Sequence, residues 1–223
     1  MKSASYTKQL QELLLEIEAE YKYTCCMTGR PVPSSNVIKA MTNVPRHKFV
    51  PTPLRDRAYE NIPLPIGLNQ TISQPYIVAI MTDLLDLDSD STVLEIGTGC
   101  GYQAAVLAEI ARQVYSIEII EQHAQDATQR LQKLGYKNVT VRFGDGHNGW
   151  PEFAPFDAII VTAAAKEIPV NLVRQLAPGG KLIAPVETHY FRQQLLLISK
   201  KYDESTQVSE ILDVAFVLMT GGP

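Results

Sequence analysis

The sequence of 223 residues is poor in cysteine and has no cluster of basic residues, and each shortage argues against a class of protein. Its three cysteines, Cys25, Cys26 and Cys100, include a vicinal pair that is hard to bridge, so no disulfide framework is expected. Reduced thiols are typical of cytosolic proteins, which predicts a cytoplasmic location. The net charge of −4 argues against nucleic acid as the main partner, because phosphate binding needs clustered positive charge.

Long hydrophobic runs and metal-binding patterns are also missing. No apolar stretch is long enough to cross a bilayer, and the first helical segment carries several Glu, unlike a secretory signal, so no membrane partner is expected. The histidines show no metal-ligand spacing, which predicts no metal; they are His47, His123, His147 and His189. With 45% hydrophobic residues, the chain can bury a substantial core, and residues 1–223 are expected to form one domain.

The first third of the chain has helical periodicity interrupted by proline. Apolar residues at helical spacing predict a helix over residues 7–21, and Ser35 is the expected N-cap of a second helix that ends at Met41. The proline-rich segment 45–69 predicts an irregular connection with short strands, and a third helix is expected from Ser73 or Gln74 onwards. Residues 1–72 are therefore predicted to be a helical and irregular addition to a core formed by residues 73–223.

From Thr92 onwards, strand and helix patterns alternate, which predicts a parallel α/β architecture. Two apolar runs at 194–199 and 211–218 have no helix between them and predict an antiparallel hairpin at one sheet edge. The other expected strands are 92–96, 113–117, 139–143, 157–161 and 181–185; the expected helices are 102–111, 120–134 and 172–176, the last closed by Pro178-Gly179-Gly180.

Residues 93–103 hold the most informative motif, a short apolar strand with Glu95 that runs into the turn Gly97-Thr98-Gly99-Cys100-Gly101. Glycines at this position let the backbone approach a ligand closely. The spacing departs from the G-x-G-x-x-G of dehydrogenases, because Tyr102 stands where the last glycine should be, and this disfavours a pyrophosphate ligand. Cys100 as a nucleophile is a weaker alternative to its filling a small-residue position in the turn.

A second acid, Glu118, follows the predicted strand 113–117, at a position that faces the ribose of a bound nucleoside in a βαβ unit. The two acids and three glycines resemble the cofactor site of Rossmann-like methyltransferases that use S-adenosyl-L-methionine. That cofactor has no phosphate, and its cationic groups favour nearby acids. The alternative to a cofactor site is that the glycines only form a tight turn and that Glu118 is a solvated strand end.

Further motifs make the resemblance specific. From about residue 35 to its end, the sequence resembles the protein-L-isoaspartate O-methyltransferase family. The motifs that carry this resemblance are Val44-Pro45-Arg46 with Phe49-Val50-Pro51, Gln70-Thr71-Ile72-Ser73-Gln74-Pro75, the glycine turn, Gly144-Asp145-Gly146 with Gly149-Trp150, Pro155-Phe156-Asp157, and Gln175-Leu176-Ala177-Pro178-Gly179-Gly180.

The resemblance implies a Rossmann-like seven-stranded sheet whose last strands are ordered differently from the usual methyltransferase arrangement, with an N-terminal helical addition. It implies methyl transfer from S-adenosyl-L-methionine to the α-carboxyl of L-isoaspartyl residues, and of D-aspartyl residues, in damaged proteins and peptides. The ester then loses methanol to give a succinimide, whose hydrolysis partly restores aspartate, so the activity is a repair function. A monomer is expected.

The resemblance also implies roles for single residues. Ser73 matches the family's active-site serine, whose hydroxyl would orient the substrate carboxylate; the alternative is an N-cap of the third helix. Asp145 matches the position that binds the adenine amino group, although Gly-Asp-Gly is also a turn sequence. The expected cofactor-binding residues are Thr71, Ile72, Glu95, Gly97, Gly99, Gly101, Glu118, Asp145, Gly146 and Thr220. A carboxylate nucleophile needs no general base, and the end of the fourth expected strand carries none.

Two departures from the family pattern leave the substrate preference open. Glu187 stands where relatives usually have glycine, and Val217-Leu218-Met219 stands where they have Val-Pro-Leu. Glu187 could point to solvent or could disfavour acidic substrate segments. Two other functions remain as alternatives: a related enzyme that esterifies ordinary aspartate in a dedicated peptide, and a nonenzymatic module that binds S-adenosyl-L-methionine.

Overall fold

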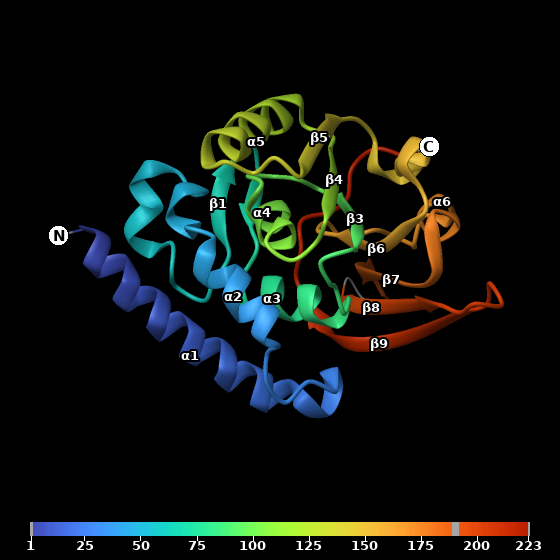
Figure 1. Cartoon of the computed structure of the whole chain (residues 1–223), viewed down its shortest axis with the longest axis horizontal. Helices are drawn as coiled ribbons and strands as arrows, with labels where there is room; N and C mark the ends of the chain where they lie inside the picture. The colour runs from blue at the N-terminus through green and yellow to red at the C-terminus, as the bar shows by residue number, and fades with distance from the viewer. Residues whose placement is uncertain (1, 189–191, 223) are drawn as a thin grey trace.

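The computed structural model describes residues 2–188 and 192–222 and shows a mostly parallel sheet with an N-terminal helical addition (Figure 1). The seven strands of the sheet lie in the order β5-β4-β3-β6-β7-β8-β9. The first five are parallel, whereas β8 and β9 run antiparallel to their neighbours. The strands are β3 (Thr92–Ile96), β4 (Gln113–Glu118), β5 (Val139–Phe143), β6 (Phe156–Val161), β7 (Leu176–Glu187), β8 (Gln193–Lys200) and β9 (Thr206–Val214). This confirms the predicted fold class.

The strand order reverses at β3, which pairs with β4 on one side and with β6 on the other. In open α/β sheets, ligands bind at such a reversal, beyond the carboxyl ends of the strands. The glycine turn follows β3 at this edge and leads into α4 (Tyr102–Ala108). The remaining helices of the core are α3 (Pro75–Leu84), α5 (Glu121–Leu134) and α6 (Val170–Arg174), with 3-10 helices η3 (Gly146–Asn148) and η4 (Pro151–Phe153).

The N-terminal addition packs against the core. It consists of α1 (Lys2–Thr28), α2 (Ser35–Asn43), the 3-10 helices η1 (Arg46–Lys48) and η2 (Thr52–Arg57), and the two-stranded sheet β1 (Leu64–Gly67) and β2 (Gln70–Ile72). Tyr21 on α1 meets Tyr76 on α3 edge to face, with ring centroids 5.8 Å apart. The Thr24 hydroxyl lies 2.6 Å from the Tyr76 hydroxyl. One hydrophobic cluster includes residues of α1, α2, α3 and α4, so both parts share a core.

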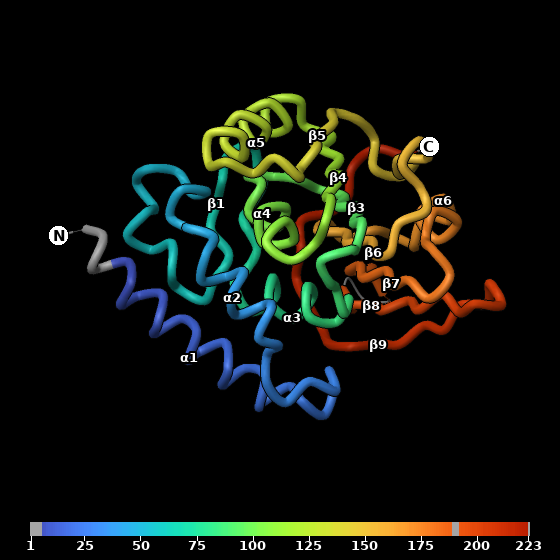
Figure 2. The backbone as a smooth tube through the Cα atoms, viewed as in Figure 1, coloured from blue at the N-terminus to red at the C-terminus, as the bar shows by residue number. Residues whose placement is uncertain are grey.

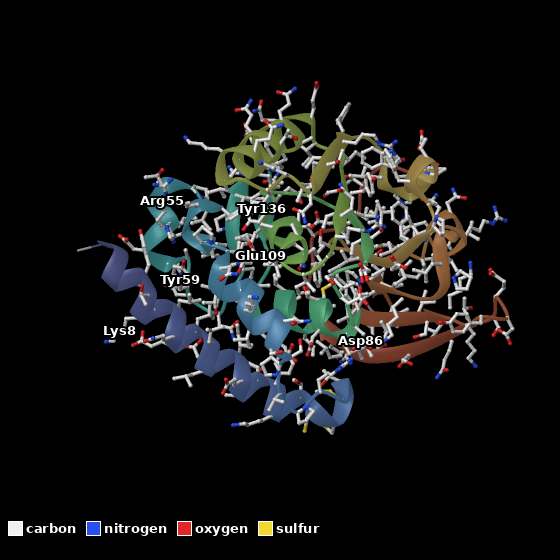
Figure 3. All side chains as sticks on the ribbon, in the orientation of Figure 1. Lys8, Arg55, Tyr59, Asp86, Glu109 and Tyr136 are labelled. Atoms are coloured by element: carbon white, nitrogen blue, oxygen red, sulfur yellow. The ribbon has the colours of Figure 1, made fainter. Side chains whose placement is uncertain are left out.

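Polar contacts at Asp86 also link the N-terminal addition to the core. Asp86 lies just beyond the end of α3 (Figure 3). It accepts hydrogen bonds from Arg30 of the addition and from Lys181 of β7. Burial acts to raise the pKa of Asp86, but the two cationic donors outweigh it and lower the pKa below its ordinary value.

The second hydrophobic cluster, which includes Trp150 and Phe156, lies among β3, β6, β7 and α6.

Some element boundaries differ from those predicted. The first helix extends to Thr28, and the N-cap of α2 is Ser34, whose hydroxyl accepts from Val37 N–H, so the expected Ser35 cap is wrong. The predicted helix over 172–176 is α6, which ends at Arg174. Pro178-Gly179-Gly180 does not close it but lies within β7, where the strand begins irregularly beside β6.

The predicted hairpin strand over 211–218 ends early, because β9 stops at Val214. The segment 215–220 leaves the sheet edge and crosses the molecule to end beside the loop after β5 (red in Figure 2). Its backbone pairs with Ala164 beyond β6: Ala164 N–H donates to Val217 carbonyl, and Met219 N–H donates to Ala164 carbonyl. The apolar run therefore covers the carboxyl edge of the sheet. Within the described residues, no helix is long and apolar enough to span a membrane.

The Arg46 side chain is fully buried and joins the addition to the core. Its guanidinium donates to the carbonyls of Ala58 and Ser73, at 2.8 Å in each case. Its Cζ also lies 4.8 Å from the centre of the Tyr102 ring, at the start of α4. Burial lowers the pKa of Arg46, and no described acid forms an ion pair with it. The backbone carbonyls and the ring face therefore compensate the buried charge.

Replacing Arg46 with Met should keep the apolar stem but leave the Ala58 and Ser73 carbonyls without their donor. We expect the free energy of unfolding to fall by about 2 to 6 kcal/mol, since each of the two orphaned carbonyls costs about 1 to 3 kcal/mol. The control is Arg57→Met, which removes an exposed guanidinium paired with Glu60 and should cost at most about 1 kcal/mol. Urea unfolding measures both; equal losses would contradict a special role for Arg46.

Candidate cofactor and substrate site

A narrow groove lies where the carboxyl ends of β3, β4 and β6 meet. Its volume is about 70 Å³, and the C-terminal segment 217–220 forms one of its walls. Glu118 is the only charged side chain among the described residues that line the groove. These residues are Gln70, Thr71, Ile96, Gly97, Gly99, Ile117, Glu118, Ile119, Gly146, Thr162, Ala163, Val217, Leu218, Met219 and Thr220. A lining with one acid and no Lys or Arg suits a ligand with hydroxyls and positive charge and disfavours a phosphate.

The Glu118 carboxylate is held in a fixed position at the end of β4. One oxygen accepts from Gly99 N–H at 2.7 Å, and the other accepts from Ile120 N–H at 2.9 Å. The side chain is only 5% exposed. Because each carboxylate oxygen can accept a second hydrogen bond, Glu118 can still receive the two hydroxyls of a ribose. The residue therefore ties the glycine turn to the neighbouring strand and faces the groove.

Two glycines permit close packing beside the groove. A Cβ at Gly97, which has a φ of +97°, would lie 2.4 Å from Thr162 Oγ1, and a Cβ at Gly146 would lie 2.2 Å from Ile96 Cγ2. A side chain at either position would therefore displace Thr162 or Ile96, which line the groove. Gly101 serves a different purpose, because a Cβ there would contact Leu131 of α5 at 3.2 Å. It permits helix packing and does not line the groove.

Glu95 is fully buried beneath the turn and does not line the groove. One of its oxygens accepts from the Ser116 hydroxyl, which also lies 2.5 Å from the Thr98 hydroxyl, whereas the other has no partner among the described residues. Burial is the main cause that raises the pKa of Glu95 to about 8, and the Glu118 charge adds to the increase. The carboxyl is therefore largely protonated near neutral pH and supports the turn from below.

Asp145 also lies outside the lining of the groove. One of its oxygens accepts from the backbone and ring of His147, and the other accepts from Gly222 N–H at 2.8 Å. Burial acts to raise the pKa of Asp145, but these donors outweigh it and hold the pKa below its ordinary value. Asp145 thus holds the backbone at Gly222, near the end of the chain.

Ile72 is another expected cofactor residue that does not line the groove, because its side chain is buried in the main hydrophobic cluster.

A wider cleft of about 440 Å³ opens directly beside the groove. Its described lining residues are Pro63, Thr71, Ser73, Gln74, Ile77, Thr162, Asp213, Val214, Ala215, Phe216 and Val217. Thr71, Thr162 and Val217 line both spaces, so the cleft and the groove adjoin at these residues. Ser73 is half-buried, and its hydroxyl makes no hydrogen bond with another described residue. A ligand in the cleft would meet a ligand in the groove at the shared residues.

The structure brings six predicted cofactor residues directly into the groove lining: Thr71, Gly97, Gly99, Glu118, Gly146 and Thr220. Contact between the cofactor and Ile72, Glu95, Gly101 or Asp145 stays a prediction. Sequence reasoning assigned no role to Thr162, whose hydroxyl donates to Gly97 carbonyl at 2.6 Å. The signal for it was present, because Thr162 directly follows β6, the strand that pairs with β3.

Other candidate sites are weaker. A cavity of about 780 Å³ lies between η1, η2 and α5 and is lined by charges of both signs; none of the described residues that line it also lines the groove. Burial raises the pKa of the Cys100 thiol, which opposes its activation as a nucleophile. Among the described residues, no group of His, Cys, Asp and Glu could hold a metal ion; His189 lies outside the described residues.

A parallel sheet whose strand order reverses at a glycine turn, with a single carboxylate in the groove, has the arrangement of a Rossmann-like methyltransferase. The sequence comparison is more specific. Residues 26–223 match the family described as protein-L-isoaspartate(D-aspartate) O-methyltransferase. The chain therefore belongs to this family.

Similar proteins agree with this assignment. A protein-L-isoaspartate O-methyltransferase 2 from Syntrophobacter fumaroxidans is 56% identical over 211 residues, which are 95% of this chain and 85% of the relative. A protein-L-isoaspartate O-methyltransferase 1 from Nitrosospira multiformis is 51% identical over 222 residues, which are 100% of this chain and 91% of the relative. The expected enzyme class and activity are thereby confirmed.

Solved structures show the same fold. A protein-L-isoaspartate O-methyltransferase aligns with a TM-score of 0.82 and 31% identity over 95% of this chain and 66% of that chain. A Plasmodium falciparum structure, described as a β-aspartate methyltransferase in complex with S-adenosyl-L-homocysteine, aligns with a TM-score of 0.74 and 26% identity. That alignment covers 84% of this chain and 91% of the Plasmodium chain. The family and these structures support S-adenosyl-L-methionine as the cofactor.

Replacing Glu118 with Ala should weaken binding of S-adenosyl-L-homocysteine by roughly 10- to 100-fold, because hydrogen bonds to a charged group contribute about 1.5 to 3 kcal/mol. Glu121→Ala removes an exposed acid nearby on α5 and is the matched control. Titration calorimetry measures both affinities. Unchanged affinity in a folded Glu118→Ala protein would assign Glu118 to the turn alone.

Replacing Glu95 with Gln should change how stability depends on pH. The folded-state pKa of about 8 lies above the ordinary 4.5, so the stabilising contribution is complete below pH 4.5 and is lost as the pH rises through about 8. Between these values, the free energy of unfolding of the parent protein should fall relative to Glu95→Gln by up to about 1.4 kcal/mol per pH unit. Urea unfolding across this range tests it, with Glu121→Gln as control. Parallel pH profiles would show that Glu95 ionises normally.

Proposed function

We propose that the groove binds S-adenosyl-L-methionine and that the adjoining cleft binds an L-isoaspartyl residue, whose free α-carboxyl receives the methyl group, or a D-aspartyl residue, whose free side-chain carboxyl receives it. The observation that carries this proposal is that the two spaces share Thr71, Thr162 and Val217 as lining residues. The groove residues fit the cofactor, because the buried Glu118 carboxylate faces the groove and no Lys or Arg is among the described residues that line it. When bound, the cofactor supplies an electrophilic methyl group on its sulfonium.

The residues of the cleft act by positioning. A substrate carboxyl with a reference pKa of about 4 is already ionised near neutral pH, so the reaction needs no general base. Accordingly, no His, Lys or Tyr is among the described residues that line the cleft. Rate enhancement then rests on holding the carboxylate oxygen in line with the methyl group and on excluding water from it.

Ser73 is proposed to orient the substrate carboxylate through its hydroxyl. The alternative role as a helix cap is wrong, because α3 begins at Pro75 with Gln74 as its N-cap. The Ser73 backbone is fixed by the hydrogen bond from Arg46, while the side chain faces the cleft without a partner among the described residues. A hydroxyl that is carried on a fixed backbone and is free to donate suits recognition of a carboxylate.

The other functional readings make different predictions. An enzyme that esterifies aspartate in a dedicated peptide would methylate an aspartyl peptide and leave the isoaspartyl peptide unchanged. A nonenzymatic module would bind the cofactor without transfer. Incubating the purified protein with labelled S-adenosyl-L-methionine and a matched pair of peptides distinguishes the three. We expect label on the isoaspartyl peptide only, released as methanol as the succinimide forms.

The wider setting is also a proposal. We propose that residues 1–223 act as one methyltransferase domain, supported by the hydrophobic cluster that the addition and the core share. The free cysteines are consistent with a reducing, cytoplasmic location, and the net charge of −4 with proteins rather than nucleic acid as partners. A monomer is proposed, which sedimentation of the purified protein tests.

Replacing Ser73 with Ala should lower turnover by roughly 10- to 100-fold, the effect of losing a hydrogen bond to a charged group, while cofactor affinity and melting temperature stay near normal. Ser73→Thr keeps the hydroxyl and should retain partial activity. The control is Ser34→Ala, which removes the N-cap of α2 and should cost about 0.5 to 2 kcal/mol of stability without lowering turnover. Full turnover by Ser73→Ala would refute the assignment.

A further inference from the structure

The wall of the substrate cleft carries an acid that the methyl-transfer chemistry does not need. Asp213, near the end of β9, is the only charged side chain among the described residues that line the cleft. It is exposed and forms no ion pair with another described residue. Its carboxylate is therefore available to a bound substrate.

The part of the chain that presents Asp213 is held in place. Gln193 on β8 clamps Phe216, because its side chain donates to Phe216 carbonyl at 3.0 Å and accepts from Phe216 N–H at 2.6 Å. The ladder between β8 and β9 pairs Gln194 with Asp213 and Gln193 with Val214. The wall from Asp213 to Phe216 is thus fastened to the sheet, and the Asp213 charge stays at the rim of the cleft.

A negative charge at this position opposes the binding of further negative charge. The substrate already brings one carboxylate to the cleft, so an acidic neighbour in the peptide would add repulsion, whereas a basic neighbour could pair with Asp213. Glu187, the acid that the sequence suggested for this role, stands at the end of β7 and does not line the cleft. The cleft wall therefore points to Asp213 as the residue that reads the charge of the substrate.

We propose that Asp213 determines the sequence preference of the enzyme, and that it selects isoaspartyl segments in which a Lys or Arg flanks the damaged residue. The inference rests on the proposed function of the cleft. An exposed ion pair contributes modestly, so replacing a flanking Glu with Lys should raise kcat/KM by roughly 2- to 10-fold, mostly through KM. The preference should shrink as salt is added, because exposed charges are screened.

The test uses isoaspartyl peptides that differ only in one residue, which is Lys, Gln or Glu, placed directly before or directly after the isoaspartate. For the parent protein, we expect kcat/KM to follow the order Lys, Gln, Glu in at least one of the two placements. Asp213→Asn should bring the three peptides to similar values, and Asp213→Lys should reverse the order. The change in preference should appear in KM more than in kcat.

Two controls carry the same change of net charge. Glu210→Gln alters an exposed acid on the same strand that does not line the cleft, and Glu187→Gln alters the acid at the end of β7. Both should keep the preference for the Lys peptide. Loss of that preference in Glu187→Gln, or its persistence in a folded Asp213→Asn protein, would overturn the assignment to Asp213. No methylation of any isoaspartyl peptide would instead overturn the proposed function of the cleft.

Discussion

The buried guanidinium of Arg46 is the interaction on which the geometry of the cleft depends. One wall of the cleft comes from Pro63 and Thr71 of the N-terminal addition and from Ser73 directly after it, and the other comes from the sheet and the segment that follows β9. Arg46 donates to the Ser73 carbonyl and lies over the Tyr102 ring, at the start of the helix that follows the glycine turn. A buried charge without an acid as partner tolerates little movement of the groups that compensate it. The same contact that stabilises the fold therefore keeps the serine at a fixed place beside the groove.

Two carboxyl groups near the turn have different environments and different uses. Glu118 receives two backbone N–H groups and faces the groove, whereas Glu95 lies below the turn with one hydroxyl donor and a pKa raised by burial to about 8. A protonated Glu95 avoids placing two negative charges side by side. The single charge of the groove thus remains that of Glu118, which suits a cationic nucleoside without phosphate. The electrostatics of the site follow from burial as much as from residue type.

Local patterns in the sequence predicted the elements whose hydrogen bonds and contacts are also local or periodic. The strand ending at Ile96, the turn after it and the acid at Glu118 were predictable because alternating β and α patterns imply adjacent parallel strands. The segment 215–220 was not, because its apolar residues resemble a strand while its backbone pairs with Ala164, about fifty positions earlier. The separate roles of Gly97 and Gly101 were equally hidden, since they depend on Thr162 and on α5. Ser73 resembled a helix cap because serine is common at that position. The helix in fact begins at Pro75, whose fixed φ suits the first helical residue, so the cap is Gln74.

The C-terminal segment makes cofactor and substrate binding parts of one structure. Val217 lines both the groove and the cleft, Phe216 is clamped by Gln193, and Gly222 is held by Asp145. Residues 216–222 are thus hydrogen-bonded to the rest of the protein at both ends, and Val217 between them lines both the groove and the cleft. Because the reaction needs no general base, its rate depends on the relative placement of the two ligands, and a shift of about 1 Å in a positioning wall can cost roughly 100-fold. The walls of the cleft, rather than any proton-transferring group, are therefore where this enzyme's catalysis and its selectivity must lie.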